Sequence, residues 1–498
     1  MNVNPITRLD YPDPDVIRVE DTYYMVSTTM HFMPGCEILQ SFDLVHWEHV
    51  TYVYETLDHT DAQQLKSGQN IYGQGMWAAS LRYHEGRFYI CFVANDTRKT
   101  YLYTSEKIDG PWKKQLIEGF YHDGSLLFDE DGRSYIVYGN DEIWITELNE
   151  DLTAPKKDGL HRLLVSDHKN PELGYEGSHI QKINGYYYIF LIHSLRDRWM
   201  RTEACFYSDS LEGEFTGGDV LCDDRGYCGQ GVAQGGIVDT PDGKWYAMLF
   251  QDSGAVGRIP ILLPVTWKDH FPFFGQNGHV PEEIEVHSTR PEYIYQPLVG
   301  SDDFCNGLLP RWQFNHDPDP RYYHLDALQG TYTITTREVC TELTQAVNTL
   351  TQRMSYPSCA AEVTVDASAL KEGDVAGLCA LQGCYAAVGI TKHHGKYEVL
   401  MLDKKEDGIL DMTEGTVVES HQMDFRLEAD FCNMKDEARC YYRVNKGDWL
   451  PIGTVHKLYF KLDHFTGCRF GLFCYAAEET GGSACFRDFK YYDVDEIS

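Results

Sequence analysis

The strongest constraint on the fold is one short hairpin pattern that recurs five times within the first 250 residues. Each copy places acidic, Asn or Gly turn residues directly before a strand rich in aromatic side chains. The five copies read VEDTYYMVST, HEGRFYICFV, DEDGRSYIVYG, KINGYYYIFLI and PDGKWYAMLF. Long amphipathic helical windows are scarce between them, so the repeat predicts an almost entirely β architecture.

The distance between copies indicates what each repeat builds. The closing tyrosines of the hairpins are separated by 65, 46, 53 and 58 residues, and they are Tyr24, Tyr89, Tyr135, Tyr188 and Tyr246. Four strands with their loops need a span of this size, which is that of one propeller blade. The sequence therefore predicts a five-bladed β-propeller, and we place it at residues 1–298.

The strand that feeds each hairpin begins with an equivalent residue in every repeat. These five residues, called the ring positions below, stand eleven or twelve residues before the tyrosines and are Asp13, Trp77, Asp123, Glu176 and Gln234. If these strands are the innermost ones, the five side chains meet at one mouth of the central channel. Polar residues also begin strands merely because strand ends touch solvent, but three carboxylates in one mouth would repel one another unless a function used them.

Asp13 lies in the stretch DYPDPD, between two prolines. Proline fixes its own φ and restricts the residue before it, so the stretch holds this carboxylate stiffly. A Pro-Asp-Pro turn alone is ordinary turn chemistry. The equivalent acids in two other repeats favour a shared site instead.

Paired carboxylates across a sugar are the minimum apparatus for glycoside hydrolysis. One must be protonated to give a proton to the leaving oxygen, and the other must be ionised to activate water or attack the anomeric carbon. A third carboxylate nearby raises the pKa of the acid and keeps it protonated near neutral pH.

Composition restricts the partners. The net charge of −33 argues against nucleic acid or an anionic membrane, because both require a concentrated positive surface. A neutral substrate fits better, and the 34 tyrosines suit stacking on sugar rings.

The sequence shows neither a signal peptide nor a long apolar segment, so we expect a cytoplasmic protein or one whose export signal was removed. The 15 cysteines show no metal-site spacing and are expected to be free thiols.

All five repeats resemble a known family. The stretches YPDPDVIR, MWAASLRYHEGRFY, HDGSLLFDEDGRSY, YEGSHIQKINGYYY and AQGGIVDTPDGKWYAML are similar to glycoside hydrolase family 43, the five-bladed propeller β-xylosidases, α-L-arabinofuranosidases and arabinanases. Later stretches, SDDFCNGLLPRWQFNH and GDVAGLCALQGCYAAVGI, resemble the concanavalin A-like sandwich of its two-domain members.

The resemblance implies roles for particular residues. Asp13 is the implied general base, Asp123 the pKa modulator and orienter, and Glu176 the general acid. Because the family inverts the anomeric configuration, Asp13 would activate water, and it should stand about 6.5–9.5 Å from Glu176. The implied substrate-binding residues are Phe32, Trp77, Gln234 and Arg258. Arg258 is also a cation beside three acids, which keeps the base ionised, although a plain salt bridge is the alternative.

No metal is required for this chemistry, but structural calcium is considered at two places. Many family members have a histidine where Gln234 stands, and that histidine helps to hold a metal on the propeller axis, so the resemblance leaves calcium there in doubt. In the second domain, Asp303 and Asp488 could share a calcium, although exposed aspartates are common.

The hairpin repeat stops after Pro291, and segments such as AAEVTVDAS and CRFGLFCYA alternate or run apolar between turns. Two packed antiparallel sheets have this pattern, so we predict a jelly-roll β-sandwich over residues 299–498. It could bind sugar, buttress the propeller or form a wall of the active site.

Taken together, the sequence predicts an exo-acting inverting glycosidase. It would remove terminal α-L-arabinofuranosyl or β-D-xylosyl residues from xylan-derived oligosaccharides. The alternatives are an endo-arabinanase, which needs an open cleft, and a carbohydrate-binding propeller without catalysis. Retaining fructosidases would need WMNDPNG and RDP motifs, and neither occurs.

Overall fold

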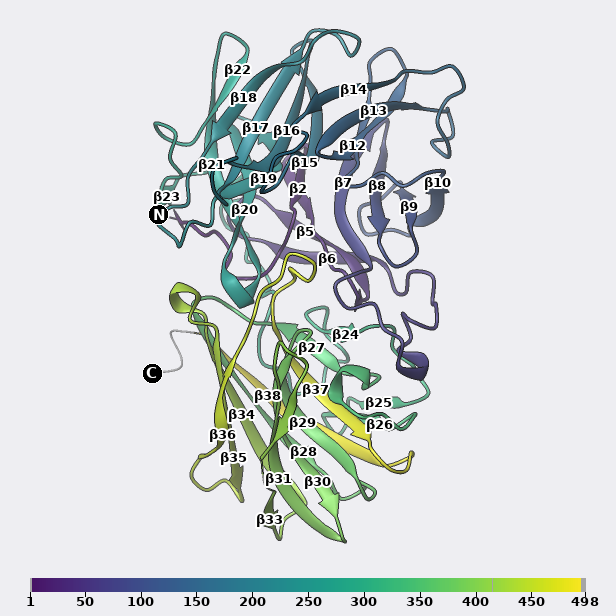
Figure 1. Cartoon of the computed structure of the whole chain (residues 1–498), viewed down its shortest axis with the longest axis vertical. Helices are drawn as coiled ribbons and strands as arrows, with labels where there is room; N and C mark the ends of the chain where they lie inside the picture. The colour runs from purple at the N-terminus through teal and green to yellow at the C-terminus, as the bar shows by residue number, and fades with distance from the viewer. Residues whose placement is uncertain (1, 414, 494–498) are drawn as a thin grey trace.

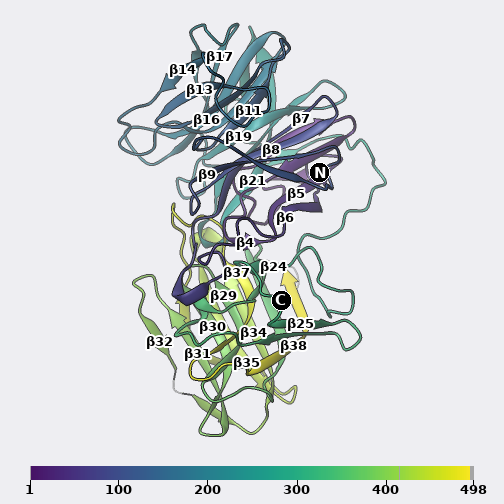
Figure 2. The same ribbon diagram turned by 90° about the vertical axis from the view of Figure 1, so that its right-hand side faces the viewer.

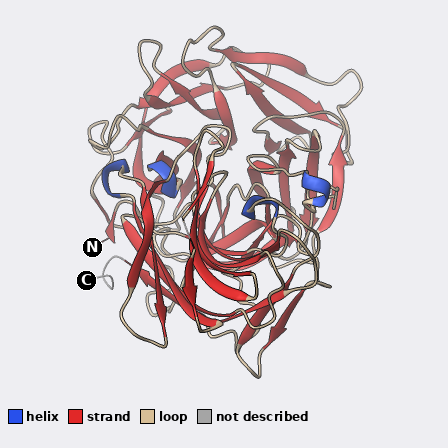
Figure 3. Cartoon of the chain, turned by 60° about the horizontal axis from the view of Figure 1, so that its bottom comes forward, coloured by secondary structure: helices blue, strands red, loops and turns tan. Residues whose placement is uncertain are grey.

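The computed structural model describes residues 2–413 and 415–493 as a five-bladed propeller stacked on a β-sandwich, which confirms the predicted fold class (Figure 1). Strands make up almost all of the regular structure, and the helices of the described residues are short 3-10 turns (Figure 3). These turns are η1 (Lys66–Gly68), η2 (Gly254–Val256), η3 (Leu343–Gln345) and η4 (Cys432–Met434). Within the described residues, no helix is long and apolar enough to span a membrane.

Each blade is a four-stranded antiparallel sheet made from consecutive strands, apart from β4, which leaves the first blade. Blade 1 contains β2 (Asp15–Val19), β3 (Thr22–Val26), β5 (Gly35–Ser41) and β6 (Glu48–Tyr54). Blade 2 contains β7 (Met76–His84), β8 (Arg87–Ala94), β9 (Lys99–Ser105) and β10 (Lys113–Ile117). Blade 3 contains β11 (Ser125–Phe128), β12 (Ser134–Asn140), β13 (Glu142–Leu148) and β14 (His161–Ser166). Blade 4 contains β15 (Glu176–Ile183), β16 (Tyr186–Ser194), β17 (Arg201–Ser208) and β18 (Thr216–Leu221). Blade 5 contains β19 (Val232–Asp239), β20 (Trp245–Asp252), β21 (Arg258–Lys268) and β22 (Phe271–Phe274).

The first strand of each blade is the innermost one, as the sequence predicts. These five strands contact one another around the axis, and each forms the edge of its own sheet. A separate apolar core fills every junction between neighbouring blades, including the junction of the first blade with the fifth. Closure of the ring therefore depends on side-chain packing, helped by the Arg18–Asp239 ion pair and by pairing of β1 (Asn2–Val3) with β23 (Glu283–Ile284).

The sandwich consists of two packed antiparallel sheets. One contains β24 (Gln313–Asn315), β27 (Leu350–Arg353), β29 (Asp374–Leu381), β30 (Tyr385–His393), β31 (Lys396–Lys404), β32 (Leu410–Met412), β33 (Thr416–Val418) and β37 (Arg469–Ala476). The other contains β25 (Tyr323–Asp326), β26 (Thr331–Thr335), β28 (Ser358–Asp366), β34 (Gln422–Asp430), β35 (Glu437–Val444), β36 (Leu450–Lys457) and β38 (Ser483–Asp493). All fifteen cysteines lie in the described residues and are unpaired, in line with the expected free thiols.

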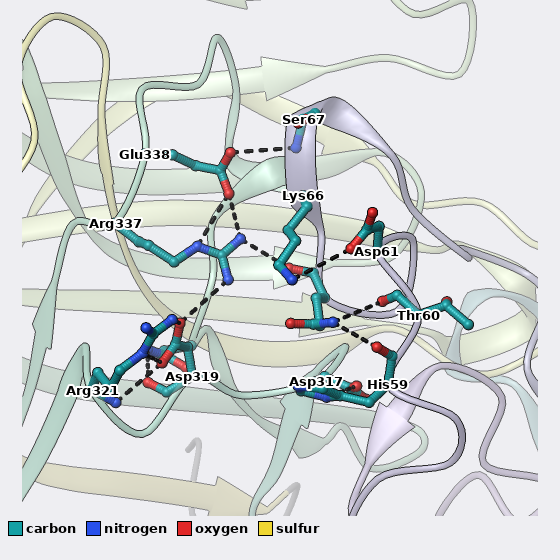
Figure 4. A network of polar contacts seen from close by, with 12 residues as sticks. His59, Thr60, Asp61, Lys66, Ser67, Asp317, Asp319, Arg321, Arg337 and Glu338 are labelled. Atoms are coloured by element: carbon teal, nitrogen blue, oxygen red, sulfur yellow. Dashed lines mark hydrogen bonds and ion pairs between the residues drawn. The ribbon is translucent and has the colours of Figure 1, made fainter.

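The two domains share a sheet. Strand β4 (Phe32–Met33) comes from the propeller sequence but pairs with β24 at the edge of a sandwich sheet (Figure 2). Propeller residues Ala255, Val256 and Ile259 also belong to the apolar core of the sandwich. A third contact is polar: Arg337 donates to the Gln64 carbonyl, and His59 Nδ1 lies 2.7 Å from Asp317 Oδ2 (Figure 4). The domains therefore form one body in which the sandwich can hold residues against the propeller.

A buried ion pair fixes this interface. Arg353 Nη1 of β27 lies 2.8 Å from Glu37 Oε2 of β5, and Arg353 Nε donates to the Asp10 carbonyl at 2.8 Å. Burial alone would raise the pKa of Glu37, but the Arg353 charge and the His49 hydrogen bond lower it to about 2. Because this pKa lies below the ordinary value of 4.5, the pair stabilises the fold above about pH 4.5 and loses its effect as pH falls toward 2.

We expect Arg353→Met to lower the free energy of unfolding by about 3–5 kcal/mol near neutral pH, because it leaves Glu37 charged, buried and without its cation. Urea unfolding at pH 7 measures the change. The matched control is Arg321→Met, since the Arg321 side chain is 76% exposed and its ion pair with Asp319 is expected to contribute less than about 1 kcal/mol. Equal losses for the two variants would contradict this account of the interface.

Candidate active site

The ring positions meet at one cavity of about 190 Å³, on the propeller face that the sandwich covers. All five ring positions line it, together with the predicted Arg258. The full lining is Asp13, Trp77, His122, Asp123, Asn140, Leu173, Glu176, Trp199, Arg201, Gln234, Arg258, Leu462 and Phe465. The register inferred from turn chemistry thus brings together side chains up to 221 residues apart in the sequence.

Unusual backbone geometry aims these side chains into the cavity. Asp13, Asp123 and Gln234 have φ of 52°, 47° and 60°, and Gly177, directly after Glu176, has φ of 66°. A non-glycine residue in this region costs on the order of 1–3 kcal/mol and persists where the surroundings enforce it. The pairing register also shifts at the start of β7, β15 and β19, and such bulges redirect side chains at strand ends.

Asp13 is buried and held by two hydrogen bonds. Thr28 Oγ1 donates to Asp13 Oδ2 at 2.6 Å, and Arg258 Nη1 donates to Asp13 Oδ1 at 2.6 Å. Arg258 is in turn fixed by Asp252, whose Oδ1 accepts from Nε at 3.1 Å. The Arg258 guanidinium thus places a positive charge directly against the Asp13 carboxylate at the cavity.

Asp123 and Glu176 lie around a histidine that the sequence pattern did not single out. His122 Nε2 is 3.5 Å from Glu176 Oε2 and 3.6 Å from Asp123 Oδ2. The Gly177 amide donates to Asp123 Oδ2 at 3.0 Å, and Asn140 Nδ2 donates to Glu176 Oε2 at 3.1 Å. The implied modulator therefore lies against the residue next to the implied acid.

The charges in this cluster favour a proton on the imidazole. Burial would lower the pKa of His122, but the charge of Asp123 and contact with Glu176 raise it to about 9. Burial would raise the pKa of Glu176, but contact with His122 and the charge of its ring hold that pKa below the ordinary value. Burial, opposed by His122 and supported by the charges of Glu176 and Asp13, raises the pKa of Asp123 to about 6. The expected acid is thus ionised beside a protonated histidine.

An aromatic wall combines both domains. Trp77 donates from Nε1 to the Gly73 carbonyl at 3.2 Å, and its ring meets Phe465 edge-on at 5.1 Å between centroids. Phe465 lies on the loop between β36 and β37 (residues 458–468), which rises from the sandwich to the propeller (Figure 1). The Gly467 amide anchors this loop to Asp10 of the propeller at 2.7 Å. The sandwich therefore supplies part of the site.

We expect Phe465→Ala to raise KM about 3–10-fold with a smaller effect on kcat, because an aromatic contact of this kind contributes about 0.5–1.5 kcal/mol. Steady-state kinetics on 4-nitrophenyl pentosides measures both constants. Phe473→Ala is unsuitable as a control because that residue is fully buried in the sandwich, whereas exposed Leu450→Ala should leave both constants unchanged. An unchanged KM in Phe465→Ala would contradict the role of this wall.

Phe32 does not line the cavity, so its prediction as a second wall is wrong. Residues 32–33 form β4 and pair with the sandwich, and the Phe32 ring packs 3.5 Å from the Arg469 guanidinium at the domain interface. Its motif gave no sign of this pairing, because the partner strand lies almost 300 residues away.

Gln234 packs against Gly177, where a Cβ atom would come within 2.6 Å of the glutamine side chain. The backbone N–H of Gln234 donates to Oε2 of buried Glu203 at 2.7 Å. Arg201, which no sequence motif indicated, is also buried at the cavity; its Nε lies 3.0 Å from Asp252 Oδ2.

The inner strands offer no calcium site at the Asp15 carboxylate, whereas calcium beside Gln234 stays a prediction. Arg82 of β7 reaches the inner strands of three other blades, donating to Asp15 Oδ2 at 2.8 Å, Ser125 Oγ at 2.7 Å and the Ile180 carbonyl at 3.2 Å. His179 Nδ1 lies 3.1 Å from the other Asp15 oxygen. A fixed guanidinium thus already neutralises the carboxylate beside the axis, and a divalent cation there would be repelled.

Among the described residues, one group of three potential metal ligands lies close together, and it is His122 with Asp123 and Glu176. Two of the three are the implied modulator and the implied acid, so the proposed acid–base chemistry accounts for the cluster without a metal. Asp303 and Asp488 belong to no such group in the described chain, and calcium between them stays a prediction.

Comparison with known proteins gives consistent matches over both domains. Residues 3–272 match the model of Glycosyl hydrolases family 43, and residues 301–492 match that of the Beta xylosidase C-terminal Concanavalin A-like domain. A beta-xylosidase of Formosa agariphila is 26% identical, covering 99% of this chain and 89% of that protein. A xylosidase/arabinosidase of Butyrivibrio fibrisolvens is 24% identical and covers 99% of both chains.

A solved structure described as a bifunctional GH43-CE protein of Bacteroides eggerthii is 42% identical to this chain, with a TM-score of 0.92. The match covers 100% of this chain and 64% of that one, so this chain spans less than two thirds of the bifunctional protein.

Proposed function

The chain belongs to glycosyl hydrolase family 43, and from this premise we propose that it removes single terminal α-L-arabinofuranosyl or β-D-xylosyl residues from oligosaccharides, with inversion. The observation that carries the proposal is the small size of the cavity. Three carboxylates face a space of about 190 Å³ that the 458–468 loop of the sandwich narrows. A cavity of this size has room for one sugar ring and suits cleavage at a chain end.

Each residue of the proposed mechanism has a physical basis. Asp13, positioned by Thr28 and Arg258, accepts a proton from the water that attacks the anomeric carbon. Glu176 delivers a proton to the leaving oxygen. Asp123 lies within reach of the Gly177 amide, so it fixes the backbone next to the acid and adds a negative charge near it. For this inverting reaction, we expect about 6.5–9.5 Å between the two reacting carboxyl groups.

The choice between the two pentoses rests on the relatives. Proteins similar to this chain are named beta-xylosidase and xylosidase/arabinosidase, which supports both sugars as substrates. Trp77 and Phe465 offer apolar faces to a sugar ring, while Asn140 and Arg201 offer hydrogen-bond donors at the same cavity.

Product analysis on natural oligomers tests the exo-acting proposal. The protein is incubated with reduced xylohexaose, arabinosyl-substituted xylo-oligosaccharides and linear arabino-oligosaccharides, and products are separated during the first few per cent of turnover. Release of monosaccharide alone is the expected result. Early release of shorter oligosaccharides from linear arabinan would indicate an endo-arabinanase, and binding without turnover would indicate a carbohydrate-binding protein.

A further inference from the structure

His122 occupies a position that acid–base chemistry can use. Its Nε2 lies between the proposed acid and the proposed modulator, 3.5 Å from Glu176 and 3.6 Å from Asp123. This nitrogen is buried and has no partner within hydrogen-bond geometry among the described residues. On the other side of Glu176, Asn140 already donates to the same carboxylate oxygen, Oε2. One neutral donor thus bonds this oxygen, and one titratable nitrogen lies 3.5 Å from it.

The groups that face His122 determine its charge. Its own segment supplies Asp123, β15 supplies Glu176, and the N-terminal segment supplies Asp13 as a further negative charge. From β7, the Trp77 ring approaches at 6.2 Å between centroids and carries no charge. The cations Arg201 and Arg258 act on Glu176 across the cavity. Three carboxylates around one imidazole favour its protonated form.

This arrangement leaves a gap in the proposed mechanism. A general acid must hold a proton when the glycosidic bond breaks, but contact with His122 outweighs burial and lowers the pKa of Glu176, which disfavours its protonated form. The nearest proton is the one on His122. Catalytic hydrogen bonds are often long in the free enzyme and shorten when substrate binds, so 3.5 Å is within the range over which transfer becomes possible.

We propose that His122 supplies the proton that Glu176 delivers to the leaving oxygen, acting through Glu176 and not on the sugar itself; this inference rests on the proposed hydrolase function. In the step, the Nε2–H bond of His122 breaks as an O–H bond forms on Glu176. The Glu176 O–H bond then breaks as the departing alcohol gains its hydrogen, while the attacking water loses a proton to Asp13. Asp13 afterwards releases a proton to solvent, and neutral His122 takes one up.

The pH dependence of catalysis distinguishes this role from a structural one. With His122 present, the site keeps its transferable proton until the imidazole titrates, and its pKa is about 9. Without it, the basic limb of kcat/KM depends on Glu176 and Asp123 alone and should move down by at least about one pH unit. We therefore expect His122→Gln to lose about tenfold or more at pH 8.5 while changing little at pH 5.5.

The experiment measures pH profiles of kcat/KM for the wild type, His122→Gln and His122→Phe on xylobiose and on 4-nitrophenyl β-D-xylopyranoside, or on the matching arabinosides if those are preferred. 4-Nitrophenolate leaves without a proton, so the shift should be clear on the disaccharide and weak on the aryl glycoside. Asn140→Ala is the matched control, because it removes the other hydrogen bond to Glu176 and should lower the rate equally at every pH. Two His122 variants of different polarity guard against a folding defect in one of them.

A basic limb that moves only in the His122 variants supports the inference. If the basic limb of the kcat/KM profile stays in place in the His122 variants while the rate falls by the same factor at every pH, the inference about His122 is overturned. The proposed hydrolase function is then unaffected. Absence of turnover by the wild type on all of these glycosides overturns the proposed function itself.

Discussion

Replacing Asp13 by Asn is expected to lower kcat by about 10³–10⁴-fold on every pentoside, whatever its leaving group. The amide keeps the shape of the side chain and can still contact Thr28 and Arg258, but it cannot accept a proton from water. Since water attack is needed for every substrate in a single-step inversion, an activated leaving group cannot compensate for the loss.

Steady-state rates on 4-nitrophenyl glycosides and on the natural disaccharide measure the effect. Asp21→Asn is the matched control, because Asp21 lies in the turn between β2 and β3 of the same blade, where its side chain is 46% exposed and pairs with Arg290. The control should keep its activity. If Asp13→Asn kept more than about a tenth of the wild-type rate, the assignment of Asp13 as the base would be wrong.

Replacing Glu176 by Gln is expected to act selectively. On xylobiose or an arabino-oligosaccharide we expect kcat to fall about 10²–10⁴-fold, because the alkoxide of a sugar is a poor leaving group and needs a proton. On 4-nitrophenyl glycosides the loss should be at least tenfold smaller. The variant also leaves His122 with one carboxylate fewer, so its pKa should fall below that of the wild type.

Rates on a series of aryl glycosides with leaving groups of rising pKa test this directly. A steeper dependence on leaving-group pKa in Glu176→Gln than in the wild type is the expected result. Exposed Glu172→Gln, four residues upstream in the same segment, should keep the wild-type slope. Equal losses on all substrates would remove Glu176 from the role of acid.

Much of the propeller follows from local chemistry. The turn residues before each aromatic strand determine where a hairpin can form, and neighbouring residues alone encode them. Counting back from the closing tyrosines then identifies the inner strands. Because the blades repeat, equivalent positions must meet at the axis, and for this reason the repeat pattern by itself assigns Asp13, Asp123 and Glu176 to one cavity.

What the sequence did not reveal depends on contacts between distant segments. Phe465 enters the cavity from a loop whose direction is decided by the docking of two domains, and no local pattern encodes that. The same docking removes Phe32 from the cavity by recruiting β4 to the sandwich sheet. His122 is the sequence neighbour of Asp123, but its proposed role depends on Glu176, which lies 54 residues further along the chain. Only the folded structure brings His122 and Glu176 together.

The pKa shifts of His122, Asp123 and Glu176 also differ from what the sequence suggested. The sequence suggested that a third carboxylate keeps the acid protonated. In the folded protein a histidine lies between those two carboxylates, and its charge lowers the pKa of Glu176 while burial raises that of Asp123. The positions of the three carboxylates can be predicted from the repeats. Their protonation states depend on burial and on charged neighbours from other blades.

The stereochemistry of the first product tests the central claim most directly. Proton NMR recorded during the first minutes of hydrolysis, before mutarotation, identifies the anomer released from a β-D-xyloside or an α-L-arabinofuranoside. Initial release of α-xylose or β-arabinofuranose, the inverted products, is the predicted result and agrees with a water activated by Asp13 and a proton delivered by Glu176. Initial release of the retained anomer would mean that a carboxylate attacks the sugar, and it would contradict the role of Asp13 as the base that activates water.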